Sequence, residues 1–277
     1  MITLEKHGDV TRVIMTSAAS RAAGYGVSAY LTRGVLIDCG FPGVGRDFAA
    51  FLDQWRPDGI ILTHHHEDHA GNVELIARGG LPILAGADTL SLLRDAGWID
   101  LYRRVIWGSP ARLVSPVTTF HSAESGLRLV RAPGHSPDHH IVWDAEREIL
   151  FSADLFLGVK VRVAFPSENS RLLAESVRAA AALRPGRMFD AHRGLVPNPV
   201  AALTAKANWM DETIGEIDRR IADGWSDRAI ARAVLGRERI THYVSRGKLS
   251  GITFVRAVRA TPPQAARVAP VSGGVRA

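Results

Sequence analysis

Four histidines and two acids occupy residues 64–69, where the sequence reads HHHEDH. The run stands where an apolar segment ends and a helical pattern begins. Residues two apart on an extended segment point to the same side, so His64 and His66 can converge on one metal ion. The turn into the helix lets Asp68 and His69 face a second ion. Imidazole and carboxylate groups are ligands of zinc, and also of iron and manganese.

Three later residues complete a set of metal-binding side chains. His135 lies in APGHSP, Asp154 ends LFSAD, and His192 ends MFDAH. Each alone would be an ordinary turn or core residue. All three, however, directly follow an apolar run that predicts a strand, and functional sites gather where strands leave the sheet in mixed α/β proteins. We therefore expect them to meet the HHHEDH run in one pocket.

The elements that must position these residues are short. Apolar runs bounded by turn residues predict strands at 10–15, 27–32, 35–38, 59–62, 82–85, 127–132, 141–144, 148–152 and 187–190. Helical patterns occur at 48–55, 70–78, 88–97 and 170–183. The pattern indicates an α+β protein in which helices cover two sheets.

Beyond residue 197 only helices are predicted, at 201–222, 227–235 and 248–260. We therefore expect a catalytic domain over residues 1–205 and a C-terminal helical extension over 206–260. The remaining residues, 261–277, have no periodic pattern and predict a disordered tail.

In this order the motifs resemble those of the metallo-β-lactamase superfamily, with a set similar to that of glyoxalase II. The resemblance spans about the first 195 residues. It implies a four-layer αββα sandwich with metals at one edge. It also implies that one metal binds His64, His66 and His135, that a second binds Asp68, His69 and His192, and that Asp154 bridges both.

Two cations about 3.5–4 Å apart can share a hydroxide and hold its pKa near neutrality. This bridging hydroxide would attack a carbonyl or phosphoryl centre, while the metals polarise the substrate and steady the leaving group. In the family, Asp68 would orient the nucleophile and protonate a poor leaving group. Zinc is the favoured metal, with manganese and iron(II) as alternatives.

Further residues are expected to support the site. His139, in GHSPDH, resembles a histidine that orients the metal ligands in glyoxalase-type relatives. Asp38 resembles the buried strand-end acid that hydrogen-bonds the metal loop. Lys160 and Arg162 follow Asp154 and are candidates for contacting an anionic substrate, although solvated charges are the plainer interpretation.

These features favour a hydrolase of ester-like bonds, with a thioester or lactone as substrate. The same fold also hosts phosphodiesterases and nucleases, and sulfur dioxygenases that bind one iron, so both stay open. A true β-lactamase is disfavoured, because those enzymes generally lack the bridging carboxylate represented by Asp154. A metal-free binding protein would not need all seven ligands.

Composition sets broader limits. Hydrophobic residues make up 46% and charged residues 22%, as in globular proteins, and the single cysteine excludes an intrachain disulfide. The net charge of +6 comes from scattered arginines, which argues against nucleic acid as a partner. A small-molecule substrate and a cytoplasmic location are expected, since no apolar signal core or membrane-length run is present. Trp107 and Trp209, taken as exposed, favour a homodimer.

Overall fold

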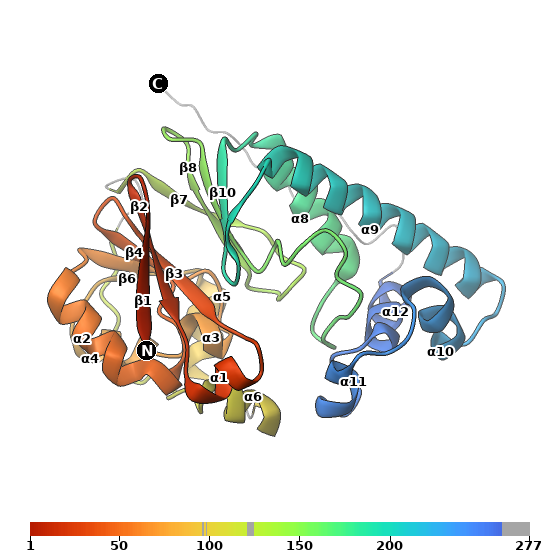
Figure 1. Cartoon of the computed structure of the whole chain (residues 1–277), viewed down its shortest axis with the longest axis horizontal. Helices are drawn as coiled ribbons and strands as arrows, with labels where there is room; N and C mark the ends of the chain where they lie inside the picture. Colours follow the sequence, from red (N-terminus) through yellow and green to blue (C-terminus); the bar gives the residue numbers. More distant parts are fainter. Residues whose placement is uncertain (96, 98, 121–124, 262–277) are drawn as a thin grey trace. The chain divides into compact units, whose positions relative to one another are not determined.

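The computed structural model describes residues 1–95, 97, 99–120 and 125–261 (Figure 1). The chain divides into two compact units. The first comprises Met1–Arg131, Asp138–Ala153 and Met188–Val196, and it contains both β-sheets. The second comprises Ala132–Pro137, Asp154–Arg187 and the residues from Pro197 onward, and its regular elements are helices.

Six strands form the first sheet, in the order β1-β2-β3-β4-β5-β6. Their bounds are β1 Ile2–His7, β2 Val10–Met15, β3 Val27–Thr32, β4 Val35–Ile37, β5 Gly59–Ile61 and β6 Ile83–Leu84. Strands β1 to β4 pair antiparallel, whereas β4, β5 and β6 pair parallel. The parallel strands are short apolar runs, typical of strands buried on both faces.

Five strands form the second sheet, in the order β11-β10-β9-β8-β7. Their bounds are β7 Leu127–Arg131, β8 His140–Asp144, β9 Ile149–Ala153, β10 Arg187–Asp190 and β11 Gly194–Val196. The predicted hairpin between β8 and β9 is present, with Asp144 opposite Ile149. Every residue of β8 and β9 is buried, so this hairpin lies at the centre of the sheet.

An apolar core joins the two sheets of the first unit. It contains Tyr30 and Ile37 from the first sheet together with Phe151 and Phe189 from the second. The rings of Phe151 and Phe189 stack at 5.6 Å, and Tyr30 lies 5.3 Å from each. The Tyr30 hydroxyl donates to the carbonyl of Asp190, so this large side chain buries no unsatisfied polar atom.

Helices cover the other face of the first sheet (Figure 1). Phe48 and Phe51 of α2 (Gly45–Trp55) and Ile76 of α4 (Val73–Arg78) pack into one core with Leu36 and Ile60 of the sheet. The first unit therefore has a helix layer and two sheet layers. Its other helices are α1 Ala18–Ala22, η1 Pro42–Val44, α3 Glu67–Ala70, α5 Ala87–Arg94 and α6 Leu101–Trp107.

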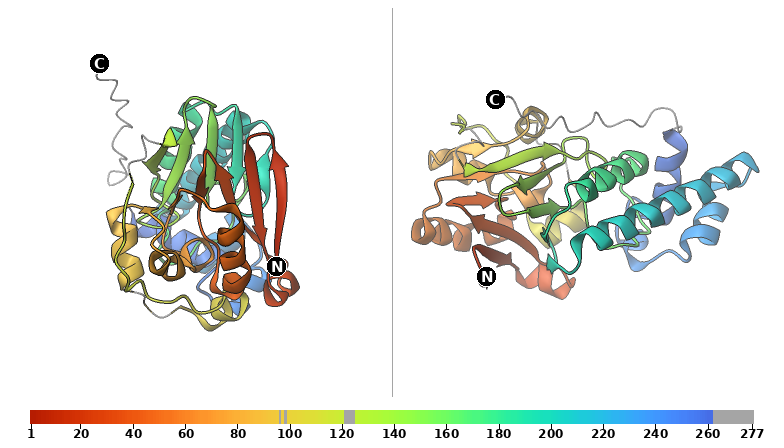
Figure 2. Two further views of the ribbon diagram at one scale, coloured as in Figure 1. Left: turned by 90° about the vertical axis from the view of Figure 1, so that its left-hand side faces the viewer. Right: turned by 90° about the horizontal axis from the view of Figure 1, so that it is seen from above.

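Helices α8 (Ser170–Ala182) and α9 (Pro199–Ala222) lie side by side in the second unit (Figure 2). The remaining helices are α10 Asp227–Ile230, η2 Ala231–Leu235, α11 Ile240–Val244 and α12 Gly251–Ala260. Lys206 of α9 is 1% exposed, and its ammonium lies 5.6 Å from the ring centre of Phe156. The face of the aromatic ring therefore helps to stabilise this buried positive charge.

The structure departs from the sequence predictions at several elements. The helix expected over residues 70–78 is two helices, α3 and α4, which are interrupted at Gly71. A Cβ at Gly71 would lie 2.9 Å from Cα of Phe41, so the backbones approach closely there. Strand β1 and helices α6 and α11 were not predicted, and the proposed domain boundary at 205/206 falls inside α9.

Other predictions concern the surface and the ends of the chain. Trp107 is only 8% exposed and packs 4.9 Å from the ring of Phe41, so it gives no support to a dimer. Trp209 is half-buried. The predicted disordered tail lies, apart from its first residue, outside the described residues. Within the described part of the chain, no helix is both long and apolar enough to cross a membrane.

Candidate metal centre

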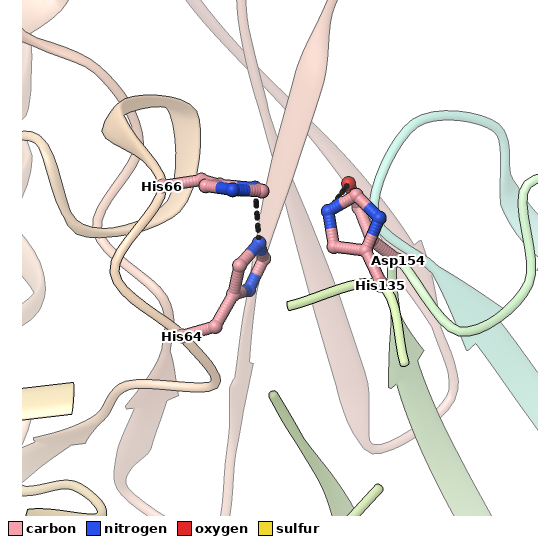
Figure 3. Close-up of side chains that lie close together, drawn as sticks. All are labelled: His64, His66, His135 and Asp154. Carbon is pink, nitrogen blue, oxygen red and sulfur yellow. Dashed lines mark hydrogen bonds and ion pairs between the residues drawn. The ribbon is translucent and has the colours of Figure 1, made fainter. Parts of the chain in front are cut away.

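Two clusters of histidine and aspartate side chains lie at the ends of these strands. The first comprises His64, His66, His135 and Asp154, each of which offers a ligand atom within 4.8 Å of the others (Figure 3). His64 presents Nε2 and His66 presents Nδ1, 3.0 Å apart. His135 Nε2 lies 3.3 Å from Oδ2 of Asp154. All four residues are buried, so water does not screen their charges.

The second cluster comprises Asp68, His69 and His192, again within 4.8 Å. Oδ2 of Asp68 lies 3.9 Å from Nε2 of His69 and 3.8 Å from Nε2 of His192. The rings of His64 and His69 are 4.2 Å apart between centres, so the two clusters are neighbours. Of the HHHEDH run, His64 and His66 thus lie in the first cluster, and Asp68 and His69 lie in the second.

The chain delivers these side chains by abrupt changes of direction after strands. Beyond β5, residues 62–66 run irregularly before α3 begins, so Asp68 and His69 sit in its only turn. Asp154 follows Ala153, the last residue of β9, whose φ of 44° is left-handed. Such a conformation costs about 1 kcal/mol or more in a residue other than glycine. The left-handed turn at Ala153 ends the alternation of side chains along β9, so Asp154 points in a different direction from the one that a continued strand would give it.

Asp38, which follows β4, fixes the proton positions on one histidine in each cluster. Its Oδ2 accepts hydrogen bonds from Nδ1 of His69 at 2.7 Å and from the Thr63 hydroxyl at 2.9 Å. Its Oδ1 accepts the Thr63 backbone N–H at 2.8 Å. Having donated its only proton, the Thr63 hydroxyl must accept from Nδ1 of His64, 3.0 Å away. The Nε2 lone pairs of His64 and His69 are therefore left for a cation.

His192 is oriented in the same way by the backbone. Its Nδ1 donates to the carbonyl of Gly26 at 2.8 Å, and a carbonyl can only accept. Nδ1 therefore carries the proton, and Nε2 keeps its lone pair toward Asp68. The Asp190 carboxylate accepts the His192 backbone N–H at 2.8 Å, which holds the turn after β10.

Sequence reasoning missed Glu168, which supports His135. Oε1 of Glu168 lies 3.4 Å from Nδ1 of His135, opposite the Nε2 atom that faces Asp154. Both side chains are largely buried, 6% and 11% exposed. A carboxylate behind the imidazole favours the proton on Nδ1 and the lone pair on Nε2. No local motif identifies Glu168, which precedes the N-cap of α8 by one residue.

Arg103 of α6 was missed as well. Its guanidinium donates two bonds to Glu67, at 2.5 and 2.7 Å, and the Glu67 carboxylate is almost fully buried. Burial raises the pKa of Glu67, and Arg103 opposes that rise. Glu67 stands between His66 and Asp68 in the sequence, so the ion pair anchors the segment that carries both clusters.

The other predicted residues lie as follows. His139 is fully buried, with its ring centre 4.9 Å from that of His64. His65 pairs instead with Asp138 at 2.8 Å and belongs to neither cluster. Asp154 belongs to the first cluster only, so its bridging role stays a prediction. Lys160 and Arg162 are exposed and belong to neither cluster.

The donor set fits divalent cations. Three imidazoles and a carboxylate in the first cluster match the ligands and the number that zinc prefers. The second cluster offers two imidazoles and a carboxylate, which leaves a coordination position open. Carboxylate or carbonyl partners on the outer nitrogens of the ligand candidates are also typical of metal-binding histidines.

Comparison with known proteins gives the family. The model of the metallo-beta-lactamase superfamily matches residues 24–192, which include all seven ligand candidates. The chain therefore belongs to the metallo-β-lactamase superfamily. A metallo-beta-lactamase family protein from Thermus thermophilus superposes with a TM-score of 0.61 at 14% identity, covering 90% of this chain and 91% of that one. FIM-1 from Pseudomonas aeruginosa, solved in a mono-zinc form, gives 0.60 at 14% identity, covering 76% and 95%. The predicted α+β fold is thus confirmed.

Among curated relatives, a probable metallo-hydrolase of Bacillus subtilis is 30% identical over 106 residues, 38% of this chain and 48% of that protein. A hydroxyacylglutathione hydrolase of Bradyrhizobium is 28% identical over 152 residues, 54% of each chain. A beta-lactamase-like protein 2 homolog of Drosophila melanogaster is 25% identical over 68% of this chain and 65% of its own length. The chain thus spans about half to two thirds of the curated relatives it matches.

Proposed function

We propose that the protein is a metal-dependent hydrolase of ester-like carbonyl bonds, with a thioester or lactone as substrate. One observation carries the proposal: seven buried or half-buried donors form two adjacent clusters, and hydrogen bonds behind them direct lone pairs inward. The relatives named hydroxyacylglutathione hydrolase, whose substrate is a thioester, support this class of bond.

We further propose that the clusters hold two divalent cations, with zinc favoured. His64, His66, His135 and Asp154 would hold one, and Asp68, His69 and His192 the other, with Asp154 reaching toward both. When bound, such a pair supplies a water nucleophile that ionises near neutral pH and a Lewis acid for the scissile carbonyl.

The protein's own groups orient the reactants and handle protons. Oδ2 of Asp68 faces the Nε2 atoms of two histidines and would bind the cation, so the other oxygen of this carboxylate is the one that can accept a proton from the attacking water. That oxygen can then return the proton to the departing oxygen or sulfur. A thiolate leaves readily without that proton, so removal of Asp68 should slow thioesters less than oxygen esters.

Metal analysis tests the proposal first. Protein purified without added metal should contain about two zinc or manganese ions per chain by mass spectrometry. Asp154→Ala should lose at least one of them and most of the hydrolytic rate. Asp88→Asn, which changes an exposed carboxylate paired with Arg131, serves as the control. A wild-type metal content and rate in Asp154→Ala would rule out the assigned cluster.

A substrate panel tests the chemistry. Thioesters, lactones, cephalosporins and phosphodiesters should be compared at equal metal loading, and we expect turnover of a thioester or lactone to dominate. Dominant phosphodiester cleavage would move the protein to the nucleases of this fold. A single bound iron with consumption of oxygen would move it to the dioxygenases.

A further inference from the structure

A small pocket in the second unit lies outside both metal clusters. Its wall combines the exposed arginines Arg162, Arg237 and Arg239 with Gly251 at the start of α12. The cavity volume is about 50 Å³, well below that of a site for a drug-sized ligand, so a small group fits and a large molecule does not.

The arginines of this pocket have no counter-charge. None of the three makes an ion pair with any residue in the part of the chain that the structure describes. Two other arginines of the same unit, by contrast, are paired: Arg171 with Asp218 and Arg259 with Asp227. Unpaired positive charges on residues that line one pocket repel one another, and a bound anion would relieve that repulsion.

The single acid of the pocket is already engaged. Glu238 accepts the backbone N–H groups of Gly251 and Ile252, at 3.1 Å each, and so caps the N-terminus of α12. That contact places its negative charge on the helix end, where it is most stabilising. Glu238 therefore orders the floor of the pocket without pairing with an arginine, and the lining keeps an excess of positive charge.

The backbone around the pocket is fixed. Ala164 and Ser250 exchange hydrogen bonds of 3.2 and 3.4 Å, which tie the segment carrying Arg162 to the N-cap of α12. Gly236, with φ of 92°, ends η2 and begins the loop that carries Arg237 and Arg239. The arginines therefore project from two segments whose backbone is held in place and needs little further ordering when a ligand binds.

We propose that this pocket binds a tetrahedral oxyanion, either inorganic phosphate or the phosphate of a monoester. Each guanidinium can donate two parallel hydrogen bonds. One bidentate arginine engages both oxygens of a carboxylate, whereas the three terminal oxygens of a phosphate provide acceptors for several arginines. The number of arginines and the size of the pocket therefore favour phosphate over a carboxylate.

Calorimetric titration with sodium phosphate, at constant chloride and near-physiological ionic strength, tests this site. We expect one saturable site, with acetate bound at least tenfold more weakly. Arg162→Ala and Arg239→Ala should each weaken phosphate binding by about 10- to 100-fold. Arg232→Ala is the matched control, because Arg232 is an exposed arginine of the neighbouring η2 that does not line the pocket.

A second variant fills the pocket without removing charge. A methyl group at Gly251 would lie 3.4 Å from Leu235 and 3.5 Å from Glu238 Oε1, both ordinary contacts. Gly251→Ala should therefore fold normally and bind phosphate more weakly. Glycerol 3-phosphate is titrated in parallel: tighter binding than phosphate identifies a monoester ligand, and weaker binding identifies the free ion.

The proposal is independent of the hydrolytic function. Phosphate also has affinity for metal ions, so each titration is repeated after chelation, with metal content measured. Binding that persists after chelation supports the arginine pocket. Binding that disappears with the metal, falls equally in Arg232→Ala, or fails to saturate would overturn it.

Discussion

Asp38 joins the two clusters through its hydrogen bonds, so one substitution there should disturb both. In Asp38→Asn, the amide oxygen can still accept the Thr63 backbone N–H. The amide nitrogen, however, replaces the oxygen that accepts from Thr63 and His69 at 2.9 and 2.7 Å. An amide donates where the carboxylate accepted, so His69 must accept on Nδ1 and carry its proton on Nε2. The Thr63 hydroxyl then turns its proton toward His64, with the same result.

The magnitude follows from these contacts. Loss of an outer hydrogen-bond partner typically weakens metal binding 10- to 100-fold. We expect about that loss in each cluster, because one histidine of each is set in the wrong tautomer. The substitution also removes the two hydrogen bonds that the buried carboxylate accepts from Thr63 and His69. Hydrogen bonds to a charged group stabilise the fold by about 1.5–3 kcal/mol each, and new hydrogen bonds of the amide offset part of this loss. The free energy of unfolding should therefore fall by a few kcal/mol.

Competition with a chromogenic chelator measures both metal affinities, and urea denaturation of the chelated protein measures stability. Asp144→Asn is the control: Asp144 is also a buried strand acid, held by Arg33 at 2.7 Å, but it belongs to neither cluster. It should lose stability and keep its metal affinity. Thr63→Val should weaken only the cluster that contains His64. Wild-type affinity at both clusters in Asp38→Asn would refute the reasoning.

Three further predictions concern side chains that hold charge. Glu168→Gln removes the carboxylate 3.4 Å behind His135 and should weaken metal binding about tenfold by chelator competition, with the unfolding midpoint nearly unchanged. Arg103→Met strands the buried Glu67 carboxylate and should cost about 3–5 kcal/mol in urea denaturation, and adding Glu67→Gln should restore part of this; an additive loss would contradict the pairing. Burial raises the pKa of Glu74, but hydrogen bonds from two backbone N–H groups and two side chains outweigh it and lower the pKa to about 2. Its stabilisation is therefore present above pH 4.5 and lost as pH falls toward 2, so the stability difference between wild type and Glu74→Gln should shrink over that interval in acid denaturation.

The strands were predictable where burial makes them apolar. β5, β8, β9 and β10 are short apolar runs that end at turn residues, and each was predicted within two residues of its bounds. β1 was missed because it is an edge strand whose residues are largely exposed. Without a buried face, its sequence shows little alternation of apolar and polar residues. α6 was missed because Leu101 and Val105 are exposed, which blurs its amphipathic period.

Local sequence patterns likewise predicted the ligand candidates but not the residues that hydrogen-bond or pair with them. His64, His66, Asp68 and His69 are close in sequence, so local geometry alone predicts how they divide. Arg103 reaches Glu67 across 36 residues and comes from a helix that the sequence did not indicate. Glu168 reaches His135 from the residue before the N-cap of a helix, a position that no local motif marks. Such contacts exist only through the fold.

Asp38 shows how the two kinds of information meet. Its resemblance to the family's buried strand-end acid predicted a hydrogen bond to the metal loop, and only the structure reveals that this one carboxylate sets the tautomers of His64 and His69 together. Its φ of 62° is left-handed, a conformation that aspartate tolerates better than most residues. A strand that continued straight would point residue 38 elsewhere, and the histidines would then choose their tautomers independently. The turn after β4 is therefore as necessary to the proposed metal centre as the HHHEDH run itself.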